Sequence, residues 1–292
     1  MTRLQSDIEL DSKAGANVAK RVFKKAEQEP IFDKYHYYRR AVQSPDIDVK
    51  FLRDTYRELK GEEPTALRED FCGTFAISCE WAKLSPRYRA YGVDVDDEPI
   101  LYGLSNNLSK LPKGTRDRVK IQQADVLNPG LPKADIVAAM NFSHYVFKDR
   151  AMMKSYFHNA NSTLNVGGLF IIDCFGGPSC QHPTKEETDH KDFTYVWEQV
   201  SFDPVSSEAL FQIHFRLKGA GGKVRRHNNV FTYDWRMWSI PELREMMMET
   251  GFRKTHVYWE GTTRDGEGDG IFSRVERGED CEAWVAYVVG EK

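Results

Sequence analysis

The sequence lacks the features that mark membrane proteins and disulfide-rich secreted proteins. No apolar run approaches the roughly 20 residues that cross a bilayer, and the first residues, MTRLQSDIELDSKAG, contain no apolar segment of the signal-peptide kind. The 5 cysteines form neither a CxxC pair nor an even framework, which fits buried free thiols in a reducing compartment. We therefore expect a cytoplasmic protein without a membrane partner, and we predict no metal site.

An excess of charge of one sign is also missing. The 41 Lys and Arg residues nearly balance the 44 Asp and Glu residues, and the formal net charge is -3. This balance argues against nucleic acid as a partner, because nucleic-acid-binding proteins carry basic patches. The chain of 292 residues is long enough for one large domain, or for one domain with a substantial insertion.

Short apolar runs alternate with helical stretches through the middle of the chain. The runs predicted as strands are residues 66–71, 90–95, 119–124, 136–140 and 169–174. The intervening stretches long enough for helices are residues 75–84, 99–108 and 151–164. Strands that alternate with helices favour a parallel sheet built from right-handed crossover units.

The pattern changes after Gly176-Gly177-Pro178. Period-two alternation predicts three antiparallel strands, at residues 193–200, 210–217 and 230–236. A helix follows at residues 240–250, with Ser239 near its N-terminal cap. Two closing strands are predicted at residues 254–260 and 283–289, separated by an acidic, glycine-rich loop at residues 261–270.

These patterns predict an α/β fold: a doubly wound, mostly parallel, seven-stranded sheet with helices on both faces and an antiparallel β insertion between strands 5 and 6. Residues 1–60 would form an N-terminal helical lid, with two helices broken near Ser44-Pro45. Residues 61–178 and 239–292 would form the main domain, and residues 179–238 the insertion.

A tight turn follows the first predicted strand, in the segment LREDFCGTF at residues 67–75. A turn with little side-chain bulk lets backbone amides approach a ligand, and the next helix adds the positive end of its dipole. The segment resembles the first motif of the class I S-adenosylmethionine (SAM)-dependent methyltransferases, in which an acidic residue precedes a glycine-rich turn. Glu69 takes the acidic position, but Phe71 and Phe75 stand where that family usually has glycine, so Gly73 alone would allow close approach.

Two further acids follow the second and third predicted strands. Asp94 lies about 25 residues after Glu69, where vicinal ribose hydroxyls need a bidentate acceptor. The resemblance implies that Asp125 accepts a hydrogen bond from the adenine amino group; a turn-forming aspartate is the alternative. We expect the carboxylates of Glu69, Asp94 and Asp125 to converge on one ligand. Glu69 and Asp70 would also repel a pyrophosphate, which favours SAM over a nicotinamide dinucleotide.

The resemblance implies a set of cofactor contacts. They are Tyr38, Arg40, Glu69, Phe71, Cys72, Gly73, Asp94, Val95, Ala124, Asp125, Val126, Asn141, Phe142 and Ser143. Tyr38 and Arg40 in the lid would meet the carboxylate of the cofactor. Residues 141–143 would line the gap between its methyl group and the acceptor.

The insertion is rich in aromatic residues, and it is similar to the antiparallel cover of small-molecule methyltransferases related to glycine N-methyltransferase. We expect Trp197, Tyr233, Trp235 and Trp259 to line the acceptor pocket, since aromatic faces hold a cationic or methylated amine. His144 is a catalytic candidate because its ordinary pKa lies near neutrality, and a packed histidine is the alternative. Asn141 is the second catalytic candidate.

The sequence therefore predicts a methyltransferase that converts SAM to S-adenosylhomocysteine (SAH) and acts on a small molecule, most readily at an amine nitrogen. Two alternatives stay open: a non-catalytic SAM-binding module, and a methyltransferase for protein side chains, whose basic peptide the acidic residues 265–269 would attract. A nicotinamide-dependent oxidoreductase is less favoured. A homodimer is one possible assembly.

Overall fold

The computed structural model describes residues 32–264 and 268–292. Residues 35–292 form one compact unit, and only residues 32–34 of the preceding unit are described. The first 31 residues of the predicted lid and residues 265–267 of the predicted acidic loop lie outside the described residues.

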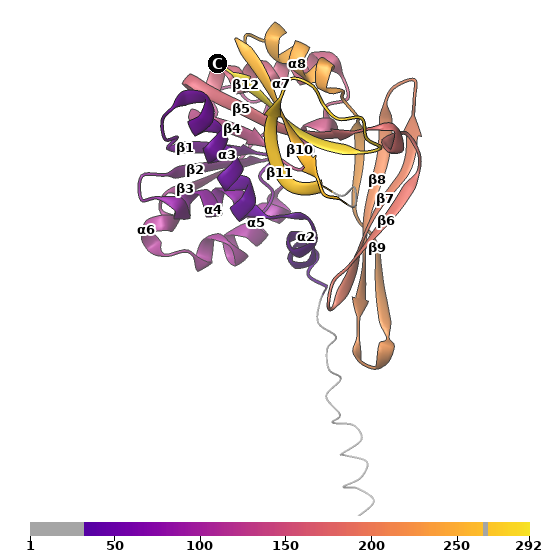
Figure 1. Ribbon diagram of the computed structural model, residues 1–292. Helices are drawn as coiled ribbons and strands as arrows, with labels where there is room; N and C mark the ends of the chain where they lie inside the picture. Colours follow the sequence, from indigo (N-terminus) through magenta and orange to yellow (C-terminus); the bar gives the residue numbers. More distant parts are fainter. Residues whose placement is uncertain (1–31, 265–267) are drawn as a thin grey trace, which may run out of the picture. The chain divides into compact units, whose positions relative to one another are not determined.

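An eight-stranded sheet forms the centre of the compact unit, in the order β11-β10-β12-β5-β4-β1-β2-β3 (Figure 1). Its strands are β1 (Ala66–Asp70), β2 (Arg89–Asp94), β3 (Val119–Gln123), β4 (Ala134–Ala139), β5 (Leu164–Gly176), β10 (Lys254–Thr262), β11 (Gly268–Val275) and β12 (Trp284–Glu291). Strands β1 to β5 pair in parallel, whereas β12 runs antiparallel to both β5 and β10. The predicted α/β class and mostly parallel sheet are confirmed. The sheet has one strand more than predicted, because the end of the predicted acidic loop and the residues after it pair with β10 as the edge strand β11.

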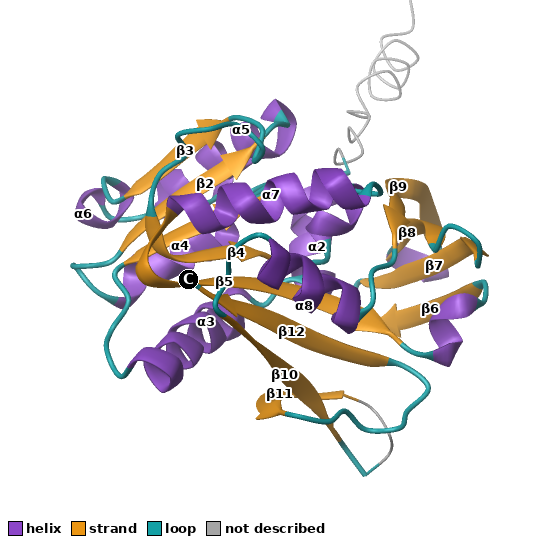
Figure 2. Cartoon of the chain, turned by 90° about the horizontal axis from the view of Figure 1, so that it is seen from above, coloured by secondary structure: helices purple, strands orange, loops and turns teal. Residues whose placement is uncertain are grey.

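Helices cover both faces of this sheet (Figure 2). On one face α3 (Pro45–Lys60) and α4 (Ala76–Leu84) pack in one apolar core, and on the other α7 (Arg150–Thr163) and α8 (Ile240–Glu249) pack in a second. The shorter helices are α2 (Lys34–Val42), α5 (Asp97–Asn106) and α6 (Lys113–Arg116). The predicted break between two lid helices is confirmed, since Ser44 caps α3 and Pro45 begins it.

A separate four-stranded antiparallel sheet occupies the predicted insertion, in the order β6-β7-β8-β9 (Figure 1). Its strands are β6 (Thr184–Asp189), β7 (Phe193–Asp203), β8 (Glu208–Lys218) and β9 (Val224–Arg236). Three of these strands were predicted. The fourth, β6, has the sequence TKEETD and is largely exposed, so it shows no apolar alternation from which it could be recognised.

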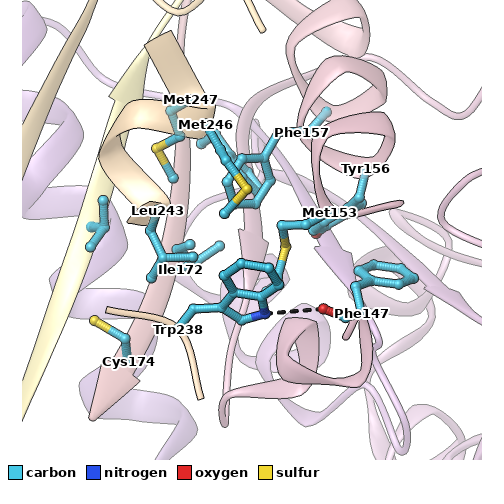
Figure 3. Packing of buried hydrophobic residues seen from close by; sticks show 14 of the residues in the cluster. Phe147, Met153, Tyr156, Phe157, Ile172, Cys174, Trp238, Leu243, Met246 and Met247 are labelled. Atoms are coloured by element: carbon cyan, nitrogen blue, oxygen red, sulfur yellow. Dashed lines mark hydrogen bonds between the residues drawn. The ribbon is translucent and has the colours of Figure 1, made fainter. Parts of the chain in front are cut away.

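The end of the insertion is fastened to the main domain by Trp238, which is fully buried. Its indole Nε1 donates a hydrogen bond to the carbonyl oxygen of Phe147 at 3.0 Å, and Met153 and Leu243 lie beside its ring in one apolar cluster (Figure 3). Ser239, which was predicted near the N-terminal cap, forms a capping box with Glu242 that begins α8 directly after this anchor. The base of the insertion is therefore fixed relative to α7, α8 and β5.

Candidate functional site

The turn after β1 has the backbone of a glycine-rich turn, although two of its residues are phenylalanine. Phe71, Gly73 and Phe75 all have positive φ angles, of 54°, 50° and 47°. A left-handed backbone costs roughly 1–2 kcal/mol for a residue with a Cβ, and packing of the two rings offsets this cost. The Phe75 ring is fully buried against Gly103, where a Cβ would lie 2.4 Å from it. The Phe71 ring packs on the opposite side, 5.7 Å from the ring of Phe147.

Gly73 faces open space within this turn. A Cβ built on Gly73 would meet no atom within 4 Å. Its amide donates a hydrogen bond to Oδ2 of Asp94 at 2.7 Å. This hydrogen bond joins the first turn to the end of β2.

The end of β2 is joined in turn to the end of β3. Oδ1 of Asp94 accepts a hydrogen bond from the amide of Asp96 at 2.9 Å, and its carbonyl oxygen accepts one from the amide of Ala124 at 2.8 Å. Asp125 is exposed, and its Oδ1 accepts a hydrogen bond from the amide of Leu127 at 2.8 Å. The turn-forming arrangement that was the alternative for Asp125 is therefore present.

Apolar side chains lie beside these two strand ends. Val95 is 69% exposed, whereas Val126 is buried. Because the solvent reaches most of Val95, its side chain presents an exposed apolar surface next to Asp94.

Glu69 does not share the surroundings of Asp94. Its Oε2 accepts hydrogen bonds from the amide and the hydroxyl of Ser78, at 2.8 and 2.6 Å. Burial raises the pKa of the Glu69 carboxyl to about 8, although the Ser78 hydrogen bonds act in the opposite direction. Glu69 fixes the first turn of α4, so it does not take part in the expected convergence of three carboxylates on one ligand.

Asp70 points to the opposite face of the sheet and is also unavailable. It is fully buried in a bidentate ion pair with Arg68, at 2.7 and 3.1 Å, and it accepts a hydrogen bond from the Tyr156 hydroxyl. Because Arg68 balances its charge, the argument that Asp70 would repel a pyrophosphate has to be corrected.

The end of β4 is held in an unusual backbone conformation. Asn141 and Phe142 have φ angles of 57° and 58°, and their amides donate to the two carboxylate oxygens of Asp173 on β5, at 2.7 and 2.8 Å. Asp173 is buried, and burial raises its pKa to about 7. The sequence reasoning missed Asp173; the available signal was an acid inside the apolar run of residues 169–174. Ser143 follows and donates its hydroxyl to the carbonyl oxygen of Met140 at 2.8 Å.

A cavity of about 500 Å³ lies between the end of β4, helix α2, the insertion and the ends of β5, β10 and β12. It brings together the four predicted acceptor-pocket residues with three predicted cofactor residues: Trp197, Tyr233, Trp235, Trp259, Tyr38, Asn141 and Phe142. Tyr38 and Tyr233 lie close enough for each phenol to influence the pKa of the other. Burial raises the pKa of Tyr38 to about 12, so both phenols stay protonated at neutral pH.

The structure does not place Arg40 at the strand ends. Its guanidinium forms two hydrogen bonds with Asp192, at 2.7 and 2.5 Å, and lies 4.8 Å above the ring of Phe193. The preceding residue, Arg39, instead donates to Oδ1 of Asn107 at 2.9 Å. The side-chain amide of Asn107 donates to the carbonyl oxygen of Thr74 at 2.8 Å, so Arg39 is linked to the first turn through Asn107.

The structure also contradicts the catalytic role of His144. The side chain is fully buried and does not line the cavity, and neither ring nitrogen has a hydrogen-bond partner among the described residues. Burial lowers its pKa to about 3, so the ring is neutral at physiological pH. His144 is the packed histidine that was the alternative.

Within the described ranges, no helix is long and apolar enough to span a bilayer. No group of three or more His, Cys, Asp and Glu side chains that could hold a metal ion was found in this part of the chain.

No protein-family model and no curated protein sequence matches the chain. Among solved structures, it is similar to a SAM-dependent methyltransferase from Clostridium acetobutylicum, with 16% identity over 88% of this chain and 96% of that chain and a TM-score of 0.64. It is also similar to CalS10, an amino pentose methyltransferase from Micromonospora echinaspora, with 14% identity over 89% and 98% of the two chains and a TM-score of 0.62. KedS8, a sugar N-methyltransferase from Streptoalloteichus, shares 17% identity over 100% and 98%, with a TM-score of 0.59. The chain has the Rossmann-like fold of SAM-dependent methyltransferases, and the predicted resemblance is confirmed at the level of the fold.

Proposed function

We propose that the protein is a SAM-dependent methyltransferase that methylates a small molecule at an amine nitrogen and releases SAH. One observation carries this proposal: Asn141 and Phe142, which follow β4 next to β1 in the sheet, line an aromatic cavity. In open α/β sheets, ligands bind beyond the carboxyl ends of the strands, where the strand order reverses. Here that point lies between β1 and β4. Among the similar structures, CalS10 is an amino pentose methyltransferase and KedS8 a sugar N-methyltransferase, which supports an amine acceptor.

The residues at the strand ends fit SAM. The space at Gly73 would take the methionine portion, beside the N-terminus of α4 and the Arg39 guanidinium, which suits its carboxylate. Asp94 would accept hydrogen bonds from the ribose hydroxyls. Val95 would cover the adenine ring, which Ala124, Asp125 and Val126 at the end of β3 would border.

The remaining cofactor residues would act through the backbone and through packing. Cys72 is buried and its amide donates to the carbonyl oxygen of Val93 at 3.0 Å, so it sets the course of the first turn. Phe71 and Phe75 hold that turn in its left-handed form. Glu69 holds the beginning of α4, where the helix dipole faces the site.

When bound, SAM supplies a methyl group that its sulfonium activates for in-line displacement. The chain's own contribution is to orient the acceptor and to exclude water. Asn141 and Phe142 lie at the boundary between the two ligands, and the Tyr38 and Tyr233 hydroxyls can hydrogen-bond to the acceptor nitrogen. The attacking nitrogen must be neutral to offer its lone pair, so an amine that enters as an ammonium ion would first give its proton to Glu260 or to water. His144 is buried away from the cavity and would take no part.

The domain roles follow from the same proposal. Residues 61–178 and 239–292 would bind the cofactor, residues 179–238 would cover the acceptor, and the described part of residues 1–60 would close the site through α2. All five cysteines are free thiols, and we propose the reducing cytoplasm as the location. A homodimer is a possible assembly that sedimentation of the purified protein would test.

Calorimetric titration with SAM, SAH and NADH tests the assignment. We expect SAM and SAH to bind and NADH to give no heat, and we expect Asp94→Asn to weaken SAM binding at least tenfold, because hydrogen bonds to a charged group are worth about 1.5–3 kcal/mol. A wild-type protein that ignores SAM and SAH would refute the proposal. Binding of SAM without SAH production from any amine would instead support a non-catalytic module.

A further inference from the structure

We infer that the cavity selects acceptors of ring size that carry a positive charge and have neither a carboxylate nor a phosphate group. This inference rests on the proposed function, because it names the class of molecule that the methyl transfer would serve. It is carried by the side chains that line the cavity, by the signs of their charges and by the cavity volume.

Aromatic side chains from two different sheets line the cavity. Tyr195, Trp197, Tyr233 and Trp235 come from the insertion, and Trp259 and Trp284 come from the main sheet. Within the insertion the rings of Tyr233 and Trp235 stack at 4.5 Å, and on the main sheet those of Trp259 and Trp284 lie 5.2 Å apart. A cation between such faces gains about 0.5–2 kcal/mol for each well-placed ring. The same faces pack against a flat ring of any charge, so they set the shape of the acceptor.

The charged residues of the lining are all acidic. Among the described residues that line the cavity, none is lysine, arginine or histidine, whereas Glu186 and Glu260 are both present. Lys185 lies between Thr184 and Glu186 on β6, but it points to the other face of the strand and pairs with Glu198 at 2.6 Å. A carboxylate or phosphate on the acceptor would therefore lose its hydration without gaining a cationic partner, which is strongly unfavourable.

Glu260 is the lining residue best placed to recognise the positive charge. It is half-buried on β10, next to Trp259, and it forms no ion pair within the described ranges. The amide of Gly270 donates to its Oε1 at 3.1 Å, which fixes the carboxylate at the cavity wall. Burial is the main cause that raises the pKa of Glu260, and a cation bound beside the carboxylate would lower this pKa again.

The volume of the cavity sets a lower limit on the size of the acceptor. About 500 Å³ lies within the range of roughly 300–1,000 Å³ that is typical of sites for drug-sized ligands. A glycine-sized acceptor would leave most of the aromatic surface in contact with water. An amine that carries at least one ring would cover it.

Three indoles with the same ring and different charges test this inference. Tryptamine carries one positive charge, tryptophan carries no net charge, and indole-3-acetate carries one negative charge. Binding is measured by calorimetry on the full chain, with and without saturating SAH, so that it does not depend on turnover. Glucosamine and glucosamine 6-phosphate serve as a second pair, in which a sugar ring replaces the indole.

We expect tryptamine to bind at least about tenfold more tightly than tryptophan, a difference of about 1.4 kcal/mol, and indole-3-acetate to bind most weakly. Glucosamine should likewise bind more tightly than its phosphate. Glu260→Gln should remove most of the preference for tryptamine over indole-3-acetate. Glu187→Gln is the matched control, because Glu187 lies on β6 outside the cavity and pairs with Arg216 at 2.6 Å. Thermal melts of both variants verify that they are folded.

Equal affinity for tryptamine and indole-3-acetate would overturn the inference, as would failure of both tryptamine and glucosamine to bind. An unchanged preference in a folded Glu260→Gln variant would also overturn it. These results are distinguishable from failure of the proposed function, which is decided by SAM binding and by SAH production. If the protein bound tryptamine selectively but did not bind SAM, the charge selectivity of the cavity would stand and the methyltransferase assignment would be wrong.

Discussion

Replacing Gly73 by alanine separates the cost of a left-handed backbone from the cost of filling a ligand site. Gly73 has a φ of 50°, and its added methyl group would meet nothing within 4 Å. In the free protein the variant therefore has no steric clash, and its amide still donates to Asp94. The expected loss of unfolding free energy is that of one left-handed alanine, about 1–2 kcal/mol.

The effect on cofactor binding should be larger than the effect on folding. If the methionine portion of SAM occupies the open space at Gly73, the methyl group overpacks the occupied site. Overpacking a well-packed site costs typically about 1–3 kcal/mol, which corresponds to a loss of roughly 5- to 150-fold in affinity. Calorimetric titration with SAM measures this loss, and urea unfolding without SAM measures the backbone cost.

Gly167→Ala is the matched control. Gly167 has a φ of 76°, and a Cβ built on it also meets nothing within 4 Å. It lies near the N-terminal end of β5, whereas Gly73 follows the C-terminal end of β1. Both variants should lose a similar amount of stability, and only Gly73→Ala should lose affinity for SAM. Equal SAM affinity in the two variants would refute the placement of the cofactor at the first turn.

Three further predictions concern charges and protonation. Burial raises the pKa of Glu69 to about 8 and that of Asp173 to about 7, whereas both lie near 4 in the unfolded chain. Between these values the folded state binds more protons than the unfolded state. The free energy of unfolding should therefore be greatest at acidic pH and fall as the pH rises through 7 and 8. Integrated from pH 6 to pH 8 the loss is on the order of 3 kcal/mol, and identical urea midpoints at the two pH values would contradict it. His144→Phe should keep full turnover and melt at the same or a higher temperature, since two unpartnered buried nitrogens disappear; lost turnover with intact SAM binding would restore the catalytic role. Arg39→Met should weaken SAM binding about tenfold, whereas Arg40→Met should leave it unchanged, and the reverse result in calorimetry would restore the predicted role of Arg40.

The periodic parts of the sequence were sufficient to predict the sheet and the places where strands end. Apolar runs separated by helical stretches gave β1 to β5, and the acids at strand ends led to Asp94. The strands β6 and β11 could not be predicted, because polar edge strands carry no apolar alternation. Their pairing partners are decided by tertiary contacts that no local pattern encodes.

The errors at the site have a common physical origin, which is side-chain direction. Glu69 and Asp70 are neighbours in a strand and point to opposite faces, where Ser78 and Arg68 bind them. On α2, Arg39 and Arg40 point to the first turn and to the insertion respectively.

Other features of the site depended on contacts between distant segments. The glycine-type backbone of Phe71 and Phe75 was unexpected because the compensating packing involves Phe147 and Gly103. A functional role of Asp173 was not predicted, because a single acid inside an apolar run gives no sign in the sequence of what it binds. Its two backbone partners come from the preceding strand and become visible only in three dimensions.

The insertion is attached to the rest of the molecule at two ends of unequal strength. At one end the Trp238 indole is buried among methionines, and at the other the ion pair between Arg40 and Asp192 is accessible to solvent, with side chains 36% and 47% exposed. An exposed pair of this kind is worth at most about 1 kcal/mol and weakens with added salt. Helix α2 also packs its aromatic rings against the insertion, with Tyr37 5.1 Å from Phe193 and Tyr38 4.9 Å from Phe231. Added salt would therefore weaken the Arg40–Asp192 pair without releasing the insertion from α2, because apolar ring contacts do not depend on charge.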